Sequence, residues 1–287
     1  MKELDNLSKK ELLQLLSIIV LSDGTIAKKK QYLGPIKLET VYYNKCQHSM
    51  FKQICKKLFN KELHEYIYLC NNKKIISSRL YGKKYVKELL RLSPSYQTSP
   101  GPILSKKEFL DSAQPSIKHI LENKNIKLKR LALRTYFDFD GSIVPSFYMK
   151  YKKDKKNGKI YSYYQIQFEC PVYISETNPY LIKELVVLCK NLGLNAVIKK
   201  DKRNWSGIEG LRISELKSIK KFISWGGPIS GVKISLKSHR FFGKTKKLIC
   251  NRINYILNKG IPLSYYFKDE KGALEKKKEL DKLLFLK

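Results

Sequence analysis

The sequence predicts an α+β protein built from two copies of one unit, each with the element order α-β-β-α-β-β-α. Two observations carry this prediction. A helix-like apolar run ending in Asp-Gly occurs twice, as LSIIVLSDG at Leu16–Gly24 and as LRTYFDFDG at Leu133–Gly141. The same succession of strand pair, helix, strand pair and helix follows each run. A unit of roughly 120 residues is too long for a solenoid repeat and suits half of a larger domain.

The first unit begins with a capping signal. Ser8 and Glu11 have the spacing of a capping box, in which each side chain satisfies a free backbone amide of the other residue. The apolar run then continues to Leu21 and ends at Asp23-Gly24, where glycine can adopt the left-handed cap conformation. Alternation and turn residues predict the elements that follow: strands at 25–30 and 36–44, a helix at 49–58, a hairpin of 64–70 with 74–81, and a helix at 83–92.

The second unit repeats this order. A turn at Asn157-Gly158 joins two alternating segments, which predicts a hairpin. The elements expected are a helix at 126–139, the hairpin of 142–152 with 159–170, a helix at 178–191, a hairpin of 196–202 with 208–214, and a helix at 215–225. We therefore divide the chain into repeats at 1–125 and 126–258, with a helical extension at 259–287 whose segment 269–287 reads as a charged amphipathic helix.

Charge indicates the class of partner. The 58 Lys and Arg residues exceed the 25 Asp and Glu residues by 33, while 43% of the residues are hydrophobic, so the chain is basic and still able to form a core. The net charge is +12 over residues 1–125 and +21 over residues 126–287, which makes both repeats basic. Such an excess strains a compact fold by self-repulsion unless a polyanion relieves it, and nucleic acid is the commonest polyanion.

Cysteine spacing and hydropathy exclude two other classes. The six cysteines form no C-x-x-C pair, so a zinc finger is not expected, and we interpret them as free thiols in a reducing intracellular compartment, either an archaeal cytoplasm or an organelle matrix. No apolar run reaches the ~18 residues that a membrane span requires, so we expect no membrane partner.

The two nonapeptides, each followed by strand, strand and helix in a basic chain, resemble the signature helices of single-chain, two-repeat LAGLIDADG homing endonucleases. The resemblance covers about residues 8–258. It implies that the two helices pack along a pseudo-twofold axis, that the antiparallel sheets form a DNA-binding saddle, and that the acid before each glycine lies at the base of the helix interface. Those acids are Asp23 and Asp140.

The resemblance also implies a metal site and its neighbours. Phosphodiester hydrolysis uses carboxylates to hold divalent metals, so Asp23 and Asp140 are the expected ligands of Mg²⁺, and Mn²⁺ or Ca²⁺ is expected to fit there too. Asp138 lies off the shared face and is interpreted as structural. Aligning GPILSKKEF (101–109) with GVKISLKSH (231–239) places Lys107 on Lys237, a pair expected near the scissile phosphates. Asn44 is a candidate water-binding residue, with a surface turn as the equal alternative.

Strand alternation selects the expected DNA contacts, because only every second side chain faces the groove. These candidates are Lys28, Lys30, Lys37, Glu39 and Arg79 in the first repeat and Lys150, Lys152, Gln165, Gln167, Lys199 and Arg212 in the second. A solvated surface or a plain phosphate contact is the alternative role for each of them. Strands of about eight residues in two repeats predict a site of roughly 16 to 24 base pairs, bound by a monomer.

The function predicted from these features is metal-dependent, site-specific double-strand cleavage of DNA that promotes intron mobility. The alternative is an RNA maturase or a non-cleaving DNA-binding regulator on the same fold.

Overall fold

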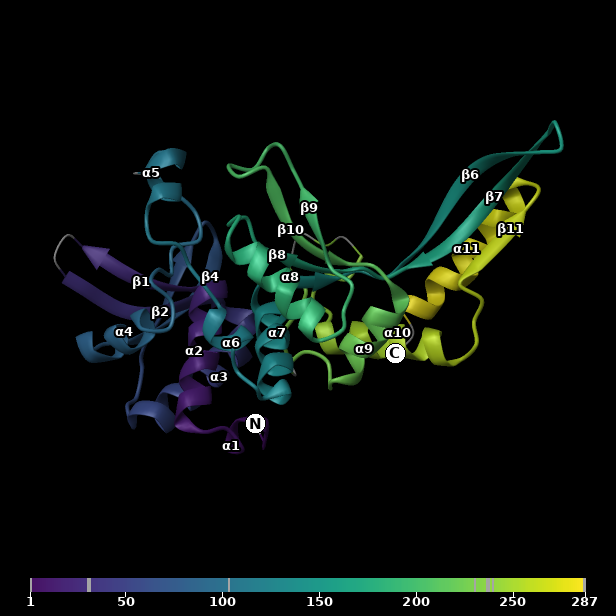
Figure 1. Cartoon of the computed structure of the whole chain (residues 1–287). Helices are drawn as coiled ribbons and strands as arrows, with labels where there is room; N and C mark the ends of the chain where they lie inside the picture. The colour runs from purple at the N-terminus through teal and green to yellow at the C-terminus, as the bar shows by residue number, and fades with distance from the viewer. Residues whose placement is uncertain are drawn as a thin grey trace.

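The computed structural model describes residues 2–29, 32–102, 104–229, 231–235, 238 and 240–285. Figure 1 shows an elongated molecule in which the first and second halves of the chain lie side by side and a long arm projects from the second half. In this view α2, α3, α7, α9 and α10 lie along the lower side, with the strands reaching above them. No helix within the described ranges is long and apolar enough to cross a bilayer.

The first half forms one antiparallel sheet of four strands in the order β1-β2-β4-β3. Its strands are β1 (Gly24–Lys29), β2 (Tyr32–Val41), β3 (His64–Cys70) and β4 (Lys73–Leu80). Its helices are α1 (Lys2–Asp5), α2 (Lys9–Ser22), the short η1 (Tyr42–Asn44), α3 (Lys45–Phe59), α4 (Lys83–Leu90), α5 (Lys106–Asp111) and α6 (Lys118–Leu121). The predicted capping box forms, since Ser8 accepts from the Glu11 amide while the Glu11 carboxylate accepts from the Ser8 amide.

The second half builds an equivalent sheet in the order β5-β8-β10-β9. Its strands are β5 (Gly141–Ile143), β8 (Val172–Ser175), β9 (Val197–Lys200) and β10 (Ile208–Ile213). Its helices are α7 (Ile126–Asp140), α8 (Leu181–Asn191), α9 (Leu216–Ser224) and α10 (Lys246–Asn258). The two sheets have the same strand order, with β5, β8, β10 and β9 in the places of β1, β2, β4 and β3. The α+β fold with two α-β-β-α-β-β-α repeats is therefore confirmed.

The predicted hairpin at 142–170 exists, but only its base pairs within the repeat's sheet. Its outer strands, β6 (Ser146–Lys156) and β7 (Lys159–Glu169), continue the register of β5 and β8 and pair with β11 (Ser264–Phe267) in a sheet of order β11-β7-β6. The C-terminal helix α11 (Glu270–Phe285) packs on this sheet, with Ala273, Leu280 and Leu284 buried. The strands β6, β7 and β11 and the helix α11 together form the projecting arm in Figure 1, which we call the arm.

The core is centred on the contact between α2 and α7. Leu15, Leu16 and Ile19 of α2 and Leu133 and Phe137 of α7 are fully buried. At the other end of the pair, polar contacts hold the segment that leads into α7 against α2: Gln14 Nε2 donates to the His119 carbonyl at 2.7 Å, and Asn125 Nδ2 donates to Glu11 Oε1 at 2.6 Å. The two helices are therefore held side by side, which fixes the position of the residues at their C-terminal ends.

Candidate active site at the paired helix ends

Each central helix ends in an aspartate followed by a glycine that opens a strand. Asp23 follows α2 and Asp140 is the last residue of α7, with β1 starting at Gly24 and β5 at Gly141. A Cβ on Gly24 would lie 2.6 Å from the Val20 Cα, and one on Gly141 would lie 2.3 Å from the Phe137 ring. The expected left-handed cap conformation was wrong, because Gly141 has φ −98° and Gly24 has no positive φ. Close approach to the preceding turn requires glycine at both places.

The two aspartates interact with one another electrostatically. Burial raises the pKa of Asp23 to about 6, although the Lys246 ammonium opposes the shift. Burial raises the pKa of Asp140 well above its ordinary value, and the negative charge of Asp23 raises it further. Because carboxylates influence one another's pKa in this way only at close range, the structure brings both predicted acids together at the helix ends.

A buried lysine lies beside these carboxylates. Lys246, the first residue of α10, is 5% exposed, and its Nζ donates to the carbonyls of Phe137 and Asp138 at 2.8 Å each. It thus satisfies carbonyls at the end of α7 that have no partner within the helix. Burial lowers the pKa of Lys246, while Asp138, Asp140 and Asp23 oppose that shift. The Lys246 ammonium therefore interacts electrostatically with three aspartates at once.

Two further carboxylates surround the pair. Glu176, which follows β8, accepts hydrogen bonds from the Tyr136 hydroxyl and, at 2.7 Å, from the Asn178 amide. Burial raises the pKa of Glu176 to about 7, and its charge also raises the pKa of Asp140. Asp138 accepts from the Ile229 amide at 2.9 Å, and burial raises its pKa to about 7. Asp138 therefore fixes a loop, in agreement with its expected structural role.

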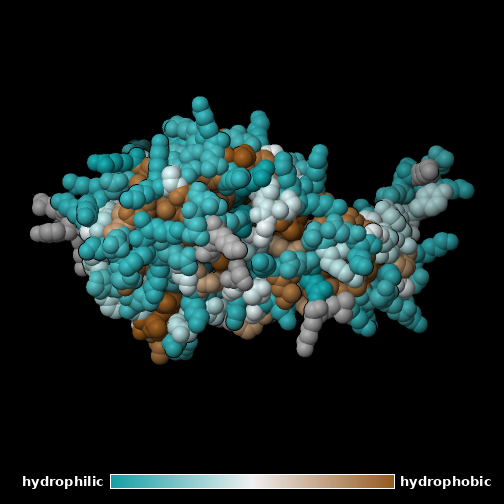
Figure 2. Space-filling view, turned by 90° about the horizontal axis from the view of Figure 1, so that it is seen from below, coloured by the Kyte–Doolittle hydropathy of each residue, from teal (hydrophilic) through white to brown (hydrophobic). Residues whose placement is uncertain are grey.

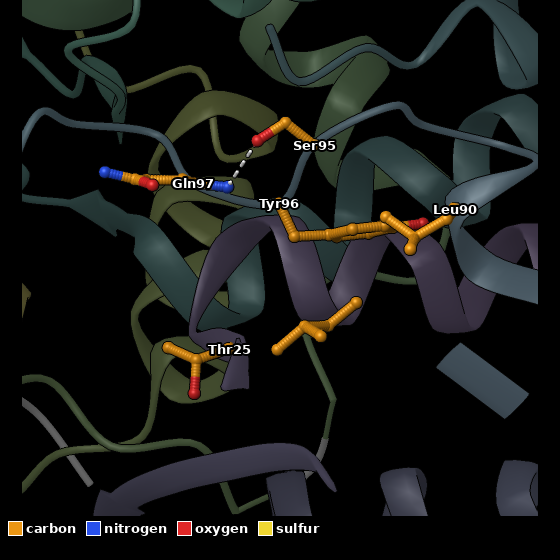
Figure 3. Close-up of a pocket in the computed structure, with 6 residues that line it drawn as sticks. Thr25, Leu90, Ser95, Tyr96 and Gln97 are labelled. Carbon is orange, nitrogen blue, oxygen red and sulfur yellow. Dashed lines mark hydrogen bonds between the residues drawn. The ribbon is translucent and has the colours of Figure 1, made fainter. Parts of the chain in front are cut away.

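Cavities open on both sides of the helix ends. A cavity of about 400 Å³ is lined by Asp140, Ser142, Tyr173 and residues of β10, and another of about 380 Å³ is lined by Asn44, Gly141, Lys233 and Lys246. In the first half, a cavity of about 270 Å³ is lined by Thr25, Leu90 and Tyr96 among others. Figure 3 shows the Tyr96 ring beside Leu90 and the backbone amide of Gln97 donating to the Ser95 hydroxyl. A cavity thus adjoins Asp140, and another adjoins Thr25, two residues after Asp23.

The other predicted catalytic residues have different surroundings. Asn44 ends η1, lines the 380 Å³ cavity, and accepts from the Lys233 amide at 2.9 Å through Oδ1, so it joins the two halves. Lys107 is an exposed residue of α5, and it is not among the groups that shift the pKa of Asp23 or Asp140. Lys237 lies outside the described residues. Among the described residues, Lys246 is the lysine that acts on both aspartates, and Lys233 lines the 380 Å³ cavity.

Three of the predicted DNA contacts of the first repeat, Lys37, Glu39 and Arg79, lie on one face of its sheet. Lys37 of β2 is the cross-strand partner of Arg79 of β4, while Leu38, the next residue, is buried on the opposite face. Lys37 Nζ contacts Glu39 at 2.6 Å, and Glu39 accepts from the Tyr68 hydroxyl. Lys28 lies in β1, and Lys30 lies outside the described residues.

In the second repeat the candidates divide between two sheets. Lys199 of β9 and Arg212 of β10 both approach the Tyr173 ring, at 5.3 and 5.6 Å from its centroid, and form one cluster on the repeat's sheet. Lys150, Lys152, Gln165 and Gln167 are on the arm instead, because the strands that carry them pair with β11. Their expected placement in the same sheet as Arg212 was therefore wrong.

Sequence reasoning missed Lys246, Glu176 and Lys233. Glu176 follows the short strand β8, and Lys233 lies in an isolated β-bridge with Thr245. Lys246 begins a helix far along the chain from Asp138, at a separation of 108 residues. The Thr245-Lys246 helix start, where Thr245 accepts from the Leu248 amide, is the only sequence signal near any of them. A capping signal locates a helix but does not indicate which side chain reaches a distant site.

The pair Asp23 and Asp140 has the chemistry of a magnesium site. Neither carboxylate accepts a hydrogen bond within the described part of the chain, because the donors of Lys246 are directed at backbone carbonyls. No cluster of three or more His, Cys, Asp or Glu side chains suited to a metal occurs among the described residues. Mg²⁺ commonly takes one or two carboxylates and completes its shell with water and phosphate oxygens, so two carboxylates suffice.

Comparisons with known proteins show what part of the chain is similar to. Residues 127–224 match the model of the LAGLIDADG-like domain. No curated protein sequence matches the chain. Similar solved structures include mesophilic variants of the homing endonuclease I-DmoI (13% identity, 75% of this chain and 88% of that chain, TM-score 0.45) and the homing endonuclease I-WcaI bound to its DNA recognition sequence (16%, 79% and 85%, 0.44). The N-terminal LAGLIDADG domain of DUF199/WhiA is also similar (14%, 80% and 90%, 0.41).

The family match and the element order of the two halves agree. The matched segment begins in α7 and ends with α9, and the first half repeats its strand order around α2. Residues 127–224 are thus similar to a LAGLIDADG-like domain, in agreement with the resemblance predicted from the nonapeptides.

Proposed function

We propose that this protein is a site-specific double-strand DNA endonuclease that hydrolyses phosphodiester bonds with Mg²⁺, acts as a monomer at a long asymmetric site, and promotes intron mobility. One observation carries the proposal. Asp23 and Asp140 end two paired helices, one from each repeat, and the charge of Asp23 raises the energetic cost of ionising Asp140. A divalent cation between them would relieve that repulsion, and each repeat then contributes one acid to a shared centre.

The residues of the site have separate roles in this proposal. Asp23 and Asp140 hold the metal, which when bound lowers the pKa of a water molecule and stabilises charge on the phosphate. Lys246 fixes the end of α7 and supplies a positive charge beside both carboxylates. Asn44 fixes the segment of Lys233 against the first repeat. Lys107 and Lys237 remain candidates for contacts to phosphate.

Duplex DNA fits the surfaces beside this site. Lys37 and Arg79 on the first sheet and Lys199 and Arg212 on the second give each repeat a basic strand face. Arginine reads guanine in the major groove, and lysine neutralises phosphates. The net charge of +33 supports binding to a long polyanion, because a small acidic ligand would leave most of it unopposed.

Cleavage of selected duplexes tests the proposal. Duplexes from a randomised library are selected by binding to the protein in EDTA, cloned into a plasmid and incubated with the protein and Mg²⁺. We expect linear plasmid that forms only when a divalent metal is present. Tight, salt-dependent binding without linearisation in Mg²⁺ or Mn²⁺ would refute the nuclease function and leave the binding function intact.

Lys246 favours a second candidate, a DNA-binding regulator that does not cut. Its ammonium already supplies positive charge at the position where a metal would act. In that case metal would change neither the stability nor the DNA affinity of the protein. A thermal shift on adding Mg²⁺ that disappears in the Asp23→Asn variant excludes this candidate.

A further inference from the structure

A cavity of about 670 Å³ lies at the start of α7, at the opposite end of that helix from Asp140. It is larger than the two cavities beside the helix ends, and its volume is within the range that holds small organic ligands. Three segments line it: α1 with the residues after it, α7 with the residues before it, and Trp225 at the end of α9. In Figure 1 the N-terminus and the start of α7 lie on the lower side, and Figure 2 shows that side as mainly hydrophilic with smaller apolar patches.

Positive charge predominates in this cavity. Four cationic side chains line it, namely Lys124, Lys127, Arg130 and Arg134. The last three have the spacing that puts side chains on one face of a helix. Among the described lining residues Glu3 is the one carboxylate; its side chain is 57% exposed, and it contacts Arg134 Nη1 at 2.8 Å. The residues of the cavity therefore leave most of this positive charge without a partner that could neutralise it.

The use of arginine separates this cavity from the general basicity of the chain. The chain has eight arginines against 50 lysines, and two of the eight line this cavity. Arg134 is 8% exposed, and its Nε donates to the Gly227 carbonyl at 2.9 Å, so its guanidinium is held in place. The Nε of Arg130 is buried and has no hydrogen-bond partner within the described structure. A planar guanidinium suits the paired oxygens of a phosphate better than the ammonium of lysine does.

Aromatic and apolar side chains form another part of the wall. Trp225 is one of two tryptophans in the chain, and its ring lies 5.3 Å from the guanidinium carbon of Arg130. Leu7 and Ile126 also line the cavity, and Ile126 is exposed. A planar ring can pack against the indole and these side chains while a charged group attached to it reaches the arginines. An inorganic anion alone would leave this part of the wall unused.

We propose that this cavity binds a small organic phosphate that carries a planar aromatic ring, the class to which nucleotides belong. The phosphate oxygens accept from Arg130 and Arg134, and the ring lies against Trp225. Glu3, which is exposed and belongs to the four-residue helix α1, is the group that the phosphate displaces from Arg134. The site goes beyond the proposed DNA cleavage and is separate from it, because the 15 residues of α7 place it ~22 Å from Asp140.

Titration with ADP in EDTA at ~0.15 M salt tests the site, because EDTA keeps divalent metals away from the aspartates. Calorimetry gives the stoichiometry, and tryptophan fluorescence reports on the cavity wall. The indole of Trp205, the other tryptophan, donates to Thr177 Oγ1 outside the cavity lining. We expect one ADP per chain and a fluorescence change that Trp205→Phe keeps and Trp225→Phe removes. A change that depends on Trp205 instead overturns the proposal.

Charge variants test the contacts to the phosphate. Arg130→Gln should weaken ADP binding at least tenfold, because it removes hydrogen bonds from a charged donor. Lys129→Gln, the neighbouring residue of α7 outside the lining, should leave the affinity unchanged within twofold. Lys127→Gln should weaken binding about threefold. Because Lys127 is exposed, this variant keeps the test open if Arg130→Gln does not fold. Equal effects of Arg130→Gln and Lys129→Gln, or no effect of Lys127→Gln, overturn the proposal.

A variant of the built-in carboxylate should act in the opposite direction. Glu3→Gln removes the group that competes for Arg134 and should tighten ADP binding severalfold, whereas Asp5→Asn, on the same helix but outside the lining, should not. Equal affinities of these two variants contradict displacement of Glu3.

The ligand series tests the chemical class. ADP should bind at least tenfold more tightly than adenosine, which lacks phosphate, and than inorganic pyrophosphate, which lacks the ring. Equal affinities for ADP and pyrophosphate, or no binding of ADP, overturn the assignment. A polyglutamate peptide that binds through Arg130 when ADP does not also overturns it and assigns the cavity to an acidic protein segment. DNA cleavage is measured separately, so each of these outcomes leaves the proposed function standing.

Discussion

Replacing Lys246 by methionine should destabilise the protein strongly and in a pH-dependent way. The change keeps an unbranched side chain one atom shorter than lysine but removes the ammonium that donates to the carbonyls of Phe137 and Asp138. Hydrogen bonds to charged groups contribute about 1.5–3 kcal/mol each, and removing one partner of a buried ionic group costs about 3–5 kcal/mol. We expect a loss of about 4 kcal/mol at pH 8, which corresponds to a lower Tm by roughly 5–10 °C.

The pH dependence follows from the carboxylates that Lys246 faces. The pKa of Asp23 is raised to about 6 and that of Asp138 to about 7, so the folded state takes up protons that the unfolded state releases, and stability falls as pH rises through these values. Without the ammonium, the free energy of unfolding should fall more steeply as pH rises. The free energy lost on Lys246→Met should therefore be smaller at pH 5 than at pH 8. Urea unfolding in EDTA measures both values, with Lys247→Met, an exposed neighbour on α10, as the control. Equal costs for the two variants, or the same cost at both pH values, would refute this account of Lys246.

Three further predictions concern close packing, buried histidine and salt. Gly141→Ala should lower the free energy of unfolding in urea by about 3 kcal/mol, because the new Cβ meets the Phe137 ring. Gly272→Ala, whose Cβ would make only ordinary contacts in α11, should leave the stability unchanged or raise it slightly. Equal effects of the two substitutions contradict the packing argument. Burial lowers the pKa of His48 to about 4, so the neutral imidazole stabilises the folded protein fully only above pH 6.5. The free energy of unfolding of wild type, relative to that of His48→Gln, should therefore fall by about 2 kcal/mol between pH 7 and pH 5. A difference that stays constant over this pH range contradicts the assignment of a buried neutral histidine. Duplex affinity should fall by about 0.9 log unit per log unit of salt for each phosphate neutralised, measured by fluorescence anisotropy, and a flat dependence contradicts the basic surface.

The central helices could be predicted from local sequence because their signals are local. The capping box at Ser8 and the two Asp-Gly ends lie within single elements, and the structure reproduces both helices. The reason for glycine was different from the expected one, since the constraint at Gly141 is contact with Phe137 and not a positive φ. A sequence pattern shows that glycine suits a helix end but not which neighbour requires it.

Strand pairing in the second repeat could not be predicted from the same signals. β5 and β8 have three and four residues, so they give almost no alternation, while the 11-residue strands β6 and β7 dominate the pattern. Their partner β11 lies about a hundred residues further along the chain. Lys246 was missed for a related reason: it is one of 50 lysines, and only the tertiary fold brings it to the end of α7.

Cleavage by the two single variants Asp23→Asn and Asp140→Asn tests the central claim most directly. Each change keeps the shape of the side chain and removes one of the two carboxylates that the helices bring together. On a plasmid carrying a selected site, with Mg²⁺ present, we predict that both variants lose double-strand cutting and keep duplex affinity close to that of wild type. Linear product formed at the wild-type rate by either variant would contradict the claim that Asp23 and Asp140 form a shared metal-dependent centre.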